Sequence, residues 1–295
     1  MENELPYPTA ARREIIREPR EEKLDPTPIF IIGYRRSGTT LLSWILDSHP
    51  RIAALPENCL CGSFLSELKR EGGADTNKPG AALVAAFGAA QLGEPATTFF
   101  RRLASVINTV CSGYATRSGK VRWASKEVYF HNKLDDLDCL FDYQPKYLYM
   151  VRHGVDAAYS AAQRFGRLGC NNESSSLSLV NYLKEWVDAN EAVARFAERN
   201  RARCHFVRYE NLVRFPDKTV AELFAFLEEA WDPSSLSEIW KLEHSPFLGA
   251  NSKEDMGKDF DPSRTNRWIN WPPELVHQLG EIANGTLTRI GYPAL

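Results

Sequence analysis

No run of apolar residues in this chain of 295 residues comes near the ~20 that a helix needs to span a bilayer, and residues 1–26 are polar and charged, unlike a signal peptide. An excess of either charge is also missing, because 36 Lys and Arg against 38 Asp and Glu give a formal net charge of −2. This balance does not indicate binding to nucleic acid or to an anionic membrane surface. We therefore expect a cytoplasmic protein without a nucleic-acid or membrane partner, in which residues 1–26 form a polar arm.

The six cysteines show no framework for disulfides or zinc. Cys59 and Cys61 are separated by one residue, which is tighter than the usual zinc-ligand pair, and no second pair matches them. A chain of this length with 43% hydrophobic residues can bury a large core without disulfides. We expect six free thiols in a reducing compartment and a single domain over residues 27–295.

Short apolar runs alternate with longer amphipathic stretches from residue 28 onward. Strands are predicted over residues 28–33, 52–58, 121–127, 146–153 and 204–212, and helices over 39–47, 155–165, 179–199 and 218–230, with Asp217 as the cap of the last. Such alternation predicts an α/β fold, with a mainly parallel sheet flanked by helices on both faces. Residues 66–120 are rich in small side chains and lack this rhythm, so we expect an inserted helical region that shapes the substrate pocket.

The stretch "PIFIIGYRRSGTT" indicates a phosphate-binding loop between a buried strand and a helix. Gly33 and Gly38 have the spacing of a P-loop, but Thr39 stands where the P-loop Lys would be, and the positive charge comes earlier, on Arg36. Free N–H groups at a helix N-terminus favour an anion, and the guanidinium and hydroxyl groups of residues 36–40 add further contacts. The missing Lys indicates a ligand without a γ-phosphate, and the sequence also lacks an apolar strand that ends in a metal-binding Asp.

The longer segment "YRRSGTTLLSWILDSHP" resembles the 5′-phosphosulfate loop of sulfotransferases that use 3′-phosphoadenosine 5′-phosphosulfate (PAPS), and is most similar to the protein-tyrosine sulfotransferase branch. The resemblance implies a P-loop-type fold and in-line transfer of a sulfuryl group to an acceptor hydroxyl. The product would be adenosine 3′,5′-bisphosphate (PAP), and no metal would be needed. Arg36, Ser37, Gly38, Thr39 and Thr40 would then bind the 5′-phosphosulfate.

Three further segments resemble donor-binding elements of the same family. In "YLYMVRHGVDAAYSAAQRF", Arg152 ends a strand and Ser160 follows eight residues later, as in the 3′-phosphate motif, with Arg164 one turn beyond on the same face. "HFVRYENLV" is similar to an element whose Tyr contacts the nucleotide, here Tyr209. "RTNRWIN" resembles the basic segment that closes over the donor, and we choose Arg267 within it.

The resemblance also implies a general base and a charge-stabilising Lys. Acceptor hydroxyls are poor nucleophiles, and a base contributes about 10²–10⁴-fold to their reaction. Glu57, 21 positions after Arg36, has the placement of the catalytic Glu of the tyrosine branch, with Glu67 and His49 as alternatives. Lys126 is expected at a strand end facing the cleft, where it and Arg36 would stabilise charge on the transferring group.

One departure from the tyrosine branch concerns its disulfide and its acceptor. The positions joined by that disulfide are Leu55 and Ser125 here, so a cytoplasmic relative with a small-molecule, natural-product or sugar acceptor is expected. Two other classes stay open, a P-loop kinase or NTPase and a nucleotide-binding module without catalysis. The missing P-loop Lys counts against the first class, and the presence of both Glu57 and Lys126 counts against the second.

Overall fold

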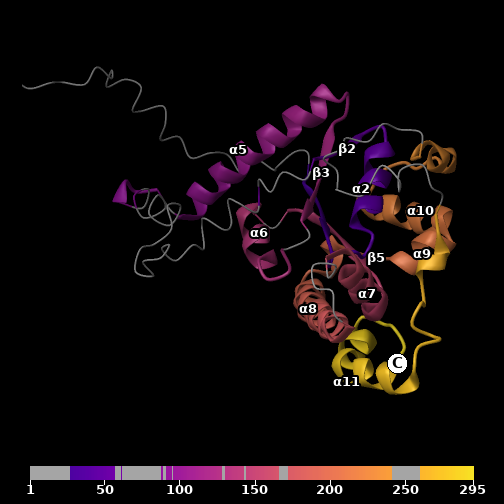
Figure 1. Ribbon diagram of the computed structural model, residues 1–295. Helices are drawn as coiled ribbons and strands as arrows, with labels where there is room; N and C mark the ends of the chain where they lie inside the picture. The colour runs from indigo at the N-terminus through magenta and orange to yellow at the C-terminus, as the bar shows by residue number, and fades with distance from the viewer. Residues whose placement is uncertain are drawn as a thin grey trace, which may run out of the picture.

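The computed structural model describes residues 27–56, 61, 88, 91–94, 96–127, 130–142, 144–165, 172–240 and 260–295. A five-stranded sheet with the order β2-β3-β1-β4-β5 lies at its centre, and every neighbouring pair is parallel (Figure 1). The strands are β1 (Ile29–Ile32), β2 (Ile52–Ala54), β3 (Arg122–Glu127), β4 (Lys146–Val151) and β5 (Cys204–Arg208). The predicted parallel sheet is thereby confirmed.

The central strand β1 explains why its sequence is a continuous apolar run rather than an alternating one. All four of its residues are buried, and it pairs with β3 on one side and β4 on the other. Phe30 and Ile32 belong to one hydrophobic core, whereas Ile29 and Ile31 belong to a second core on the opposite face. A strand covered on both faces has no polar side, as parallel sheets require.

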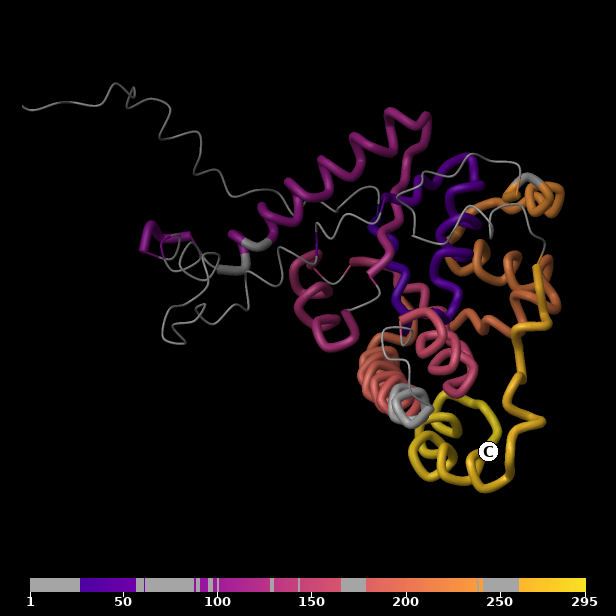
Figure 2. Tube along the Cα trace, viewed as in Figure 1, coloured from indigo at the N-terminus to yellow at the C-terminus, as the bar shows by residue number. Residues whose placement is uncertain are grey.

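The helices form two layers, one on each face of the sheet (Figures 1 and 2). One layer holds α2 (Thr39–Ser48), α9 (Tyr209–Arg214) and α10 (Pro216–Leu227). The other holds α5 (Ala96–Arg117), α6 (Leu134–Leu140), α7 (Gly154–Phe165), α8 (Asn172–Arg199) and α11 (Pro273–Arg289). Among the described residues, three short 3₁₀ helices, η2 (Arg201–Arg203), η3 (Pro233–Glu238) and η5 (Pro262–Arg264), join these elements.

Several boundaries differ from those predicted from the sequence: α8 begins at Asn172 rather than at residue 179, β2 ends at Ala54 and β4 ends at Val151. The strand expected over residues 204–212 ends at Arg208, and Tyr209 begins α9. Helix α10 begins at Pro216, the Ncap residue is Phe215, and Asp217 therefore lies in the first turn instead of capping the helix. The fixed φ angle of proline and its missing N–H suit the first helical position, which explains the earlier start.

The end of the segment expected to be an insertion is part of the core. Helix α5 packs against β2 and β3, with Ile107, Cys111 and Ala115 buried in the core, and the indole N–H of Trp123 donates to Oδ1 of Asn108 at 2.8 Å. Most of residues 66–95 lie outside the described residues, so their role in the substrate pocket stays a prediction.

Two further expectations concern free thiols and membrane-spanning helices. The four described cysteines, Cys61, Cys111, Cys139 and Cys204, are free thiols, whereas Cys59 and Cys170 lie outside the described residues. Within the described ranges, no helix has both the length and the hydrophobicity that crossing a bilayer requires.

Candidate active site

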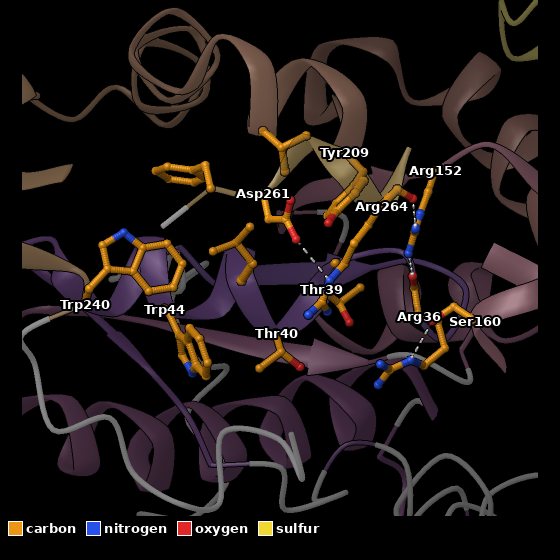
Figure 3. Close-up of a pocket in the computed structure, with 14 residues that line it drawn as sticks. Arg36, Thr39, Thr40, Trp44, Arg152, Ser160, Tyr209, Trp240, Asp261 and Arg264 are labelled. Carbon is orange, nitrogen blue, oxygen red and sulfur yellow. Dashed lines mark hydrogen bonds and ion pairs between the residues drawn. The ribbon is translucent and has the colours of Figure 1, made fainter. Parts of the chain in front are cut away.

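A cavity that Arg36, Arg152 and Ser160 line lies where the order of the strands reverses. From β1 the chain passes through α2 to the β2–β3 side of the sheet, and β4 and β5 lie on the other side. The carboxyl ends of β1 and β4 are therefore adjacent, and the chain leaves them toward opposite faces of the sheet, through α2 and α7. The crevice between these two connections is the usual ligand position in open α/β sheets. The cavity is lined by Arg36, Gly38, Thr39, Thr40, Leu41, Trp44, Arg152, Ser160, Tyr209, Val213, Trp240, Phe260, Asp261 and Arg264 (Figure 3).

The loop between β1 and α2 depends on glycine at position 38. Gly38 is the Ncap residue of α2 and has a φ angle of 101°. A Cβ atom there would lie 2.7 Å from Cδ2 of Tyr209 and 2.8 Å from Cε of Met150. The loop is thus pressed against β4 and α9, while the first turn of α2, whose N–H groups have no intrahelical acceptors, borders the cavity at Thr39 and Thr40.

Arg36 connects the two motifs that were predicted to bind phosphate. Its Nε donates to Oγ of Ser160 at 3.3 Å, and its carbonyl oxygen accepts a hydrogen bond from Nη1 of Arg152 at 2.9 Å (Figure 3). The φ angle of Arg36 is 64°, a left-handed conformation that is uncommon for a residue with a side chain. The structure therefore brings Arg36, Arg152 and Ser160 to one end of one cavity.

Arg152 is a buried cation beside this cavity. The residue is 4% exposed, and its guanidinium lies 4.5 Å from the centre of the Tyr209 ring. Its Nη2 donates to the carbonyl of Arg264 at 2.6 Å, but its Nε has no hydrogen-bond partner among the described residues. Burial lowers the pKa of Arg152 and raises that of the Tyr209 hydroxyl. A desolvated cation with donor capacity left over favours an anionic ligand.

The C-terminal basic segment reaches the cavity with a different arginine from the one chosen from the sequence. Arg264, in η5, lines the cavity, and its Nε lies 3.5 Å from Oδ2 of Asp261. Arg267 is not among the described lining residues, because its guanidinium lies over the ring of Tyr159 at 4.8 Å. The two arginines are three positions apart in the same segment, and Arg267 as a donor-binding residue stays a prediction from the sequence.

Besides Tyr209, three aromatic side chains border the cavity, and the sequence analysis did not predict them as a site. Trp44 and Trp240 meet edge to face with ring centroids 6.2 Å apart, and Trp240 meets Phe260 in the same manner at 5.5 Å. All three line the cavity. Trp44 could have been predicted from the sequence, because it lies four residues after Thr40 and thus on the same face of the helix.

Lys126 occupies the predicted position at the carboxyl end of β3. Its Nζ donates to Oγ1 of Thr40 at 3.2 Å, so its ammonium group lies at the edge of the cavity. Ser37 and Arg164 do not line the cavity, so their contacts with the donor stay predictions from the sequence. The Ser37 hydroxyl is buried without a hydrogen-bond partner among the described residues, Arg164 is exposed on α7, and neither is among the lining residues.

Of the three candidates for the general base, the structure describes only His49. Glu57 and Glu67 lie outside the described residues, so Glu57 stays a prediction from the sequence. His49 is 2% exposed, and its Nδ1 accepts from the backbone N–H of Arg51 at 3.2 Å, so its Nε2 carries the proton and donates to the carbonyl of Ala230 at 2.8 Å. His49 is the Ccap residue of α2 and is absent from the described lining of the cavity.

The sequence has relatives among characterised proteins. The model of the Sulfotransferase family matches residues 28–233. Nodulation protein NoeE of Sinorhizobium fredii is 27% identical over 271 residues, which are 86% of this chain and 62% of that protein. Protein-tyrosine sulfotransferase A of Caenorhabditis elegans is 25% identical over 277 residues, 90% of this chain and 67% of that protein. The chain thus spans only about two thirds of the length of these relatives.

Solved structures share the fold. The sulfotransferase domain from the olefin synthase of Synechococcus PCC 7002 is 22% identical, with a TM-score of 0.55 and coverage of 90% of this chain and 96% of that one. Mouse sulfotransferase SULT7A1 complexed with PAP is 16% identical, with a TM-score of 0.51 and coverage of 88% and 84%. At these identities the likeness concerns the fold alone.

Proposed function

Since this chain belongs to the sulfotransferase family, we propose that it transfers the sulfuryl group of PAPS to the hydroxyl group of a small acceptor and releases PAP. The observation that carries the proposal is the connection of Arg36 to both Arg152 and Ser160 around one cavity. A donor with phosphate groups on both the 5′ and the 3′ oxygen needs two cationic sites at a short separation. Arg36 and Arg152 would supply one cation for each phosphate.

The donor would lie along the length of the cavity. Its 5′-phosphosulfate would contact the N–H groups at the start of α2 and the side chains of Arg36, Thr39 and Thr40. Its 3′-phosphate would contact Arg152 and Ser160. Its adenine would pack among the aromatic rings of Trp44, Trp240 and Phe260, since an aromatic contact to a base contributes about 1–3 kcal/mol.

The reaction moves one proton and one sulfuryl group. A base accepts the proton of the acceptor hydroxyl, the hydroxyl oxygen bonds to sulfur, and the bond from sulfur to the bridging phosphate oxygen breaks. We assign the base to Glu57, whose carboxylate would hold the proton after transfer. Arg36 would stabilise the charge that grows on the bridging oxygen, and Lys126, held beside Thr40, would stabilise the sulfuryl oxygens.

Calorimetry with two nucleotides tests the donor assignment. PAP should bind more tightly than adenosine 5′-monophosphate, because only PAP has the 3′-phosphate. Ser160→Ala should reduce this difference and Arg152→Ala should remove most of it, since a charged hydrogen bond contributes about 1.5–3 kcal/mol. Ser48→Ala is a matched control, because that hydroxyl donates to the carbonyl of Ile45 at the other end of α2.

Two outcomes would contradict the proposal. Equal affinity of the unaltered protein for PAP and adenosine 5′-monophosphate would exclude a 3′-phosphate site. Tighter binding of ATP than of PAP, strengthened by Mg²⁺, would instead identify a kinase or NTPase. Among the described residues, no three His, Cys, Asp or Glu side chains are grouped to hold a metal ion, and PAP affinity measured with and without EDTA tests whether the donor needs one.

The acceptor class is proposed from the sequence and not from the cavity. We assign a hydroxylated small molecule, natural product or sugar, since Leu55 and Ser125 replace the disulfide of the tyrosine branch. Incubation of the protein with sulfur-labelled PAPS and panels of phenols, sugars and tyrosine peptides distinguishes these classes. Transfer to tyrosine peptides alone would refute the assignment.

A further inference from the structure

Residues 260–268, here called the strap, border the donor cavity with three of their side chains. The chain runs from the side of α9 to the side of α11 in this region (Figures 1 and 2). Phe260, Asp261 and Arg264 of the strap line the cavity. The strap therefore supplies one wall of the site, and the position of this wall determines where the Arg264 guanidinium lies.

One buried carboxylate holds the strap to the body of the protein. Oδ2 of Asp156 accepts a hydrogen bond from the backbone N–H of Asn266 at 2.7 Å, and Oδ1 accepts one from that of Arg267 at 3.1 Å. Asp156 is 1% exposed, and Asn266 has a φ angle of 60°, which turns both N–H groups toward the same side chain. Two successive N–H groups converging on one anion form a compact anion-binding turn.

The position of Asp156 in the sequence connects the strap to the residues that contact the donor. Asp156 and Ser160 lie four residues apart on α7 and thus on one helical face, and Arg152 lies four residues before Asp156, between β4 and α7. Arg152 and Ser160 line the cavity, whereas Asp156 is not among the described lining residues. Arg152 also donates to the carbonyl of Arg264, the strap residue whose guanidinium borders the cavity.

We propose that Asp156 is a positioning residue that fixes the strap over the donor cavity and thereby places Arg264 against the bound nucleotide. This inference rests on the proposed function, because it assigns Arg264 to the donor. Asp156 does not touch the donor itself. Its effect on donor affinity passes through Arg264.

A double-mutant cycle on PAP affinity tests the route of this effect. Asp156→Asn keeps the size of the side chain but replaces one acceptor with a donor that faces a backbone N–H. In the unaltered background, Asp156→Asn should weaken PAP binding roughly 10-fold, a loss within the range of interaction energies between residues in contact. In a protein that already carries Arg264→Ala, adding Asp156→Asn should weaken PAP binding by less than about 2-fold.

Hydrogen exchange measured without ligand tests separately whether Asp156 holds the strap in place, a contact called the clamp below. In the unaltered protein the N–H groups of Asn266 and Arg267 should exchange slowly with deuterium, and Asp156→Asn should accelerate exchange across residues 264–268. Asp138→Asn is the matched control. Asp138 is a 3% exposed carboxylate on α6 that accepts hydrogen bonds from Tyr147 and Arg203, so its loss should lower the melting temperature without changing PAP affinity or strap exchange.

Each outcome decides a different claim. If Asp156→Asn weakens PAP binding as much with Ala at position 264 as with Arg, Asp156 acts elsewhere, for instance through Arg152, and the inference is wrong. If Asp156→Asn leaves deuterium exchange across residues 264–268 unchanged, Asp156 does not hold the strap in place. Failure of the unaltered protein to bind PAP would refute the proposed function and the role of the strap in it, while accelerated exchange would still establish the clamp.

Discussion

The carbonyl oxygen of Arg36 accepts a hydrogen bond from Nη1 of Arg152 at 2.9 Å, although the two residues are 116 positions apart in the chain. Because this bond involves the backbone of the phosphate loop, the position of the loop and the position of the buried guanidinium depend on each other. A change that shifts one of the two phosphate sites should therefore shift the other.

Gly38→Ala should destabilise the fold and abolish PAP binding. The alanine would have to adopt the φ angle of 101°, and its Cβ would collide with Tyr209 and Met150. Strain and overpacking together should lower the free energy of unfolding by about 2–4 kcal/mol. Urea denaturation measures this loss.

Gly285→Ala provides the matched control for that change. Gly285 lies in α11, and a Cβ atom there would have no neighbour within 4 Å. Because alanine favours a helix interior over glycine, this variant should be about 0.5–1 kcal/mol more stable than the unaltered protein. A Gly38→Ala protein as stable as Gly285→Ala would show that the loop accommodates a side chain.

Lys126→Met should lower kcat by about 10²–10³-fold, the range for removal of one group that stabilises transition-state charge. PAP affinity should change little, since Lys126 contacts Thr40 rather than lining the cavity. Steady-state kinetics beside calorimetry separates the two effects. Lys146→Met removes the same charge from the first residue of β4, at the amino end of the parallel strands and away from the cavity, and should leave kcat unchanged. Equal kcat values for the two variants would remove Lys126 from the mechanism.

Glu57→Gln should lower kcat by about 10²-fold or more while PAP affinity and the melting temperature change little. The amide keeps the shape of the carboxylate but cannot accept the proton of the acceptor hydroxyl. Turnover and PAP affinity are measured on the same preparation. If turnover stays within a few-fold of the unaltered protein, the base lies elsewhere and Glu67 is tested next. If PAP binding collapses instead, Glu57 supports the loop.

The stability of the protein should fall with acidification because of His153. Burial, together with the positive charge of Arg152, lowers the pKa of His153 from 6.5 to about 4. Neither ring nitrogen has a hydrogen-bond partner among the described residues, and the ring is stacked on Trp268 of the strap at 4.9 Å. Between pH 6.5 and 4 the unfolded chain therefore binds a proton that the folded chain does not.

The sign and size of this effect follow from the lowered pKa. The contribution of His153 is fully present above pH 6.5 and is lost as the pH falls toward 4, by about 3 kcal/mol in total. Urea denaturation across this range should show a shallower pH dependence for His153→Phe, which keeps an aromatic ring but does not titrate. His277→Phe, which changes a mostly exposed histidine on α11, is the matched control. Identical slopes for all three proteins would disprove the assignment.

The elements and the motifs of this protein were determined by local sequence. The apolar run of β1, the glycines after it and the amphipathic helix α2 predict a strand, a phosphate loop and a helix, because each depends on neighbours a few residues away. The spacing of Arg152 and Ser160 is local in the same sense. These parts of the cavity, and the parallel sheet that carries them, could therefore be predicted, although the ends of β5 and α10 could not.

Only the tertiary structure decided which side chains reach the cavity. Arg264 lines it and Arg267 does not, because the turn at Asn266 and the hydrogen bonds to Asp156, 110 and 111 residues away, determine which way each points. Trp44 and Trp240 come together from two distant segments in the same way. Contacts between residues far apart in the chain leave no periodicity or short spacing in the sequence, so they become visible only once the chain has folded.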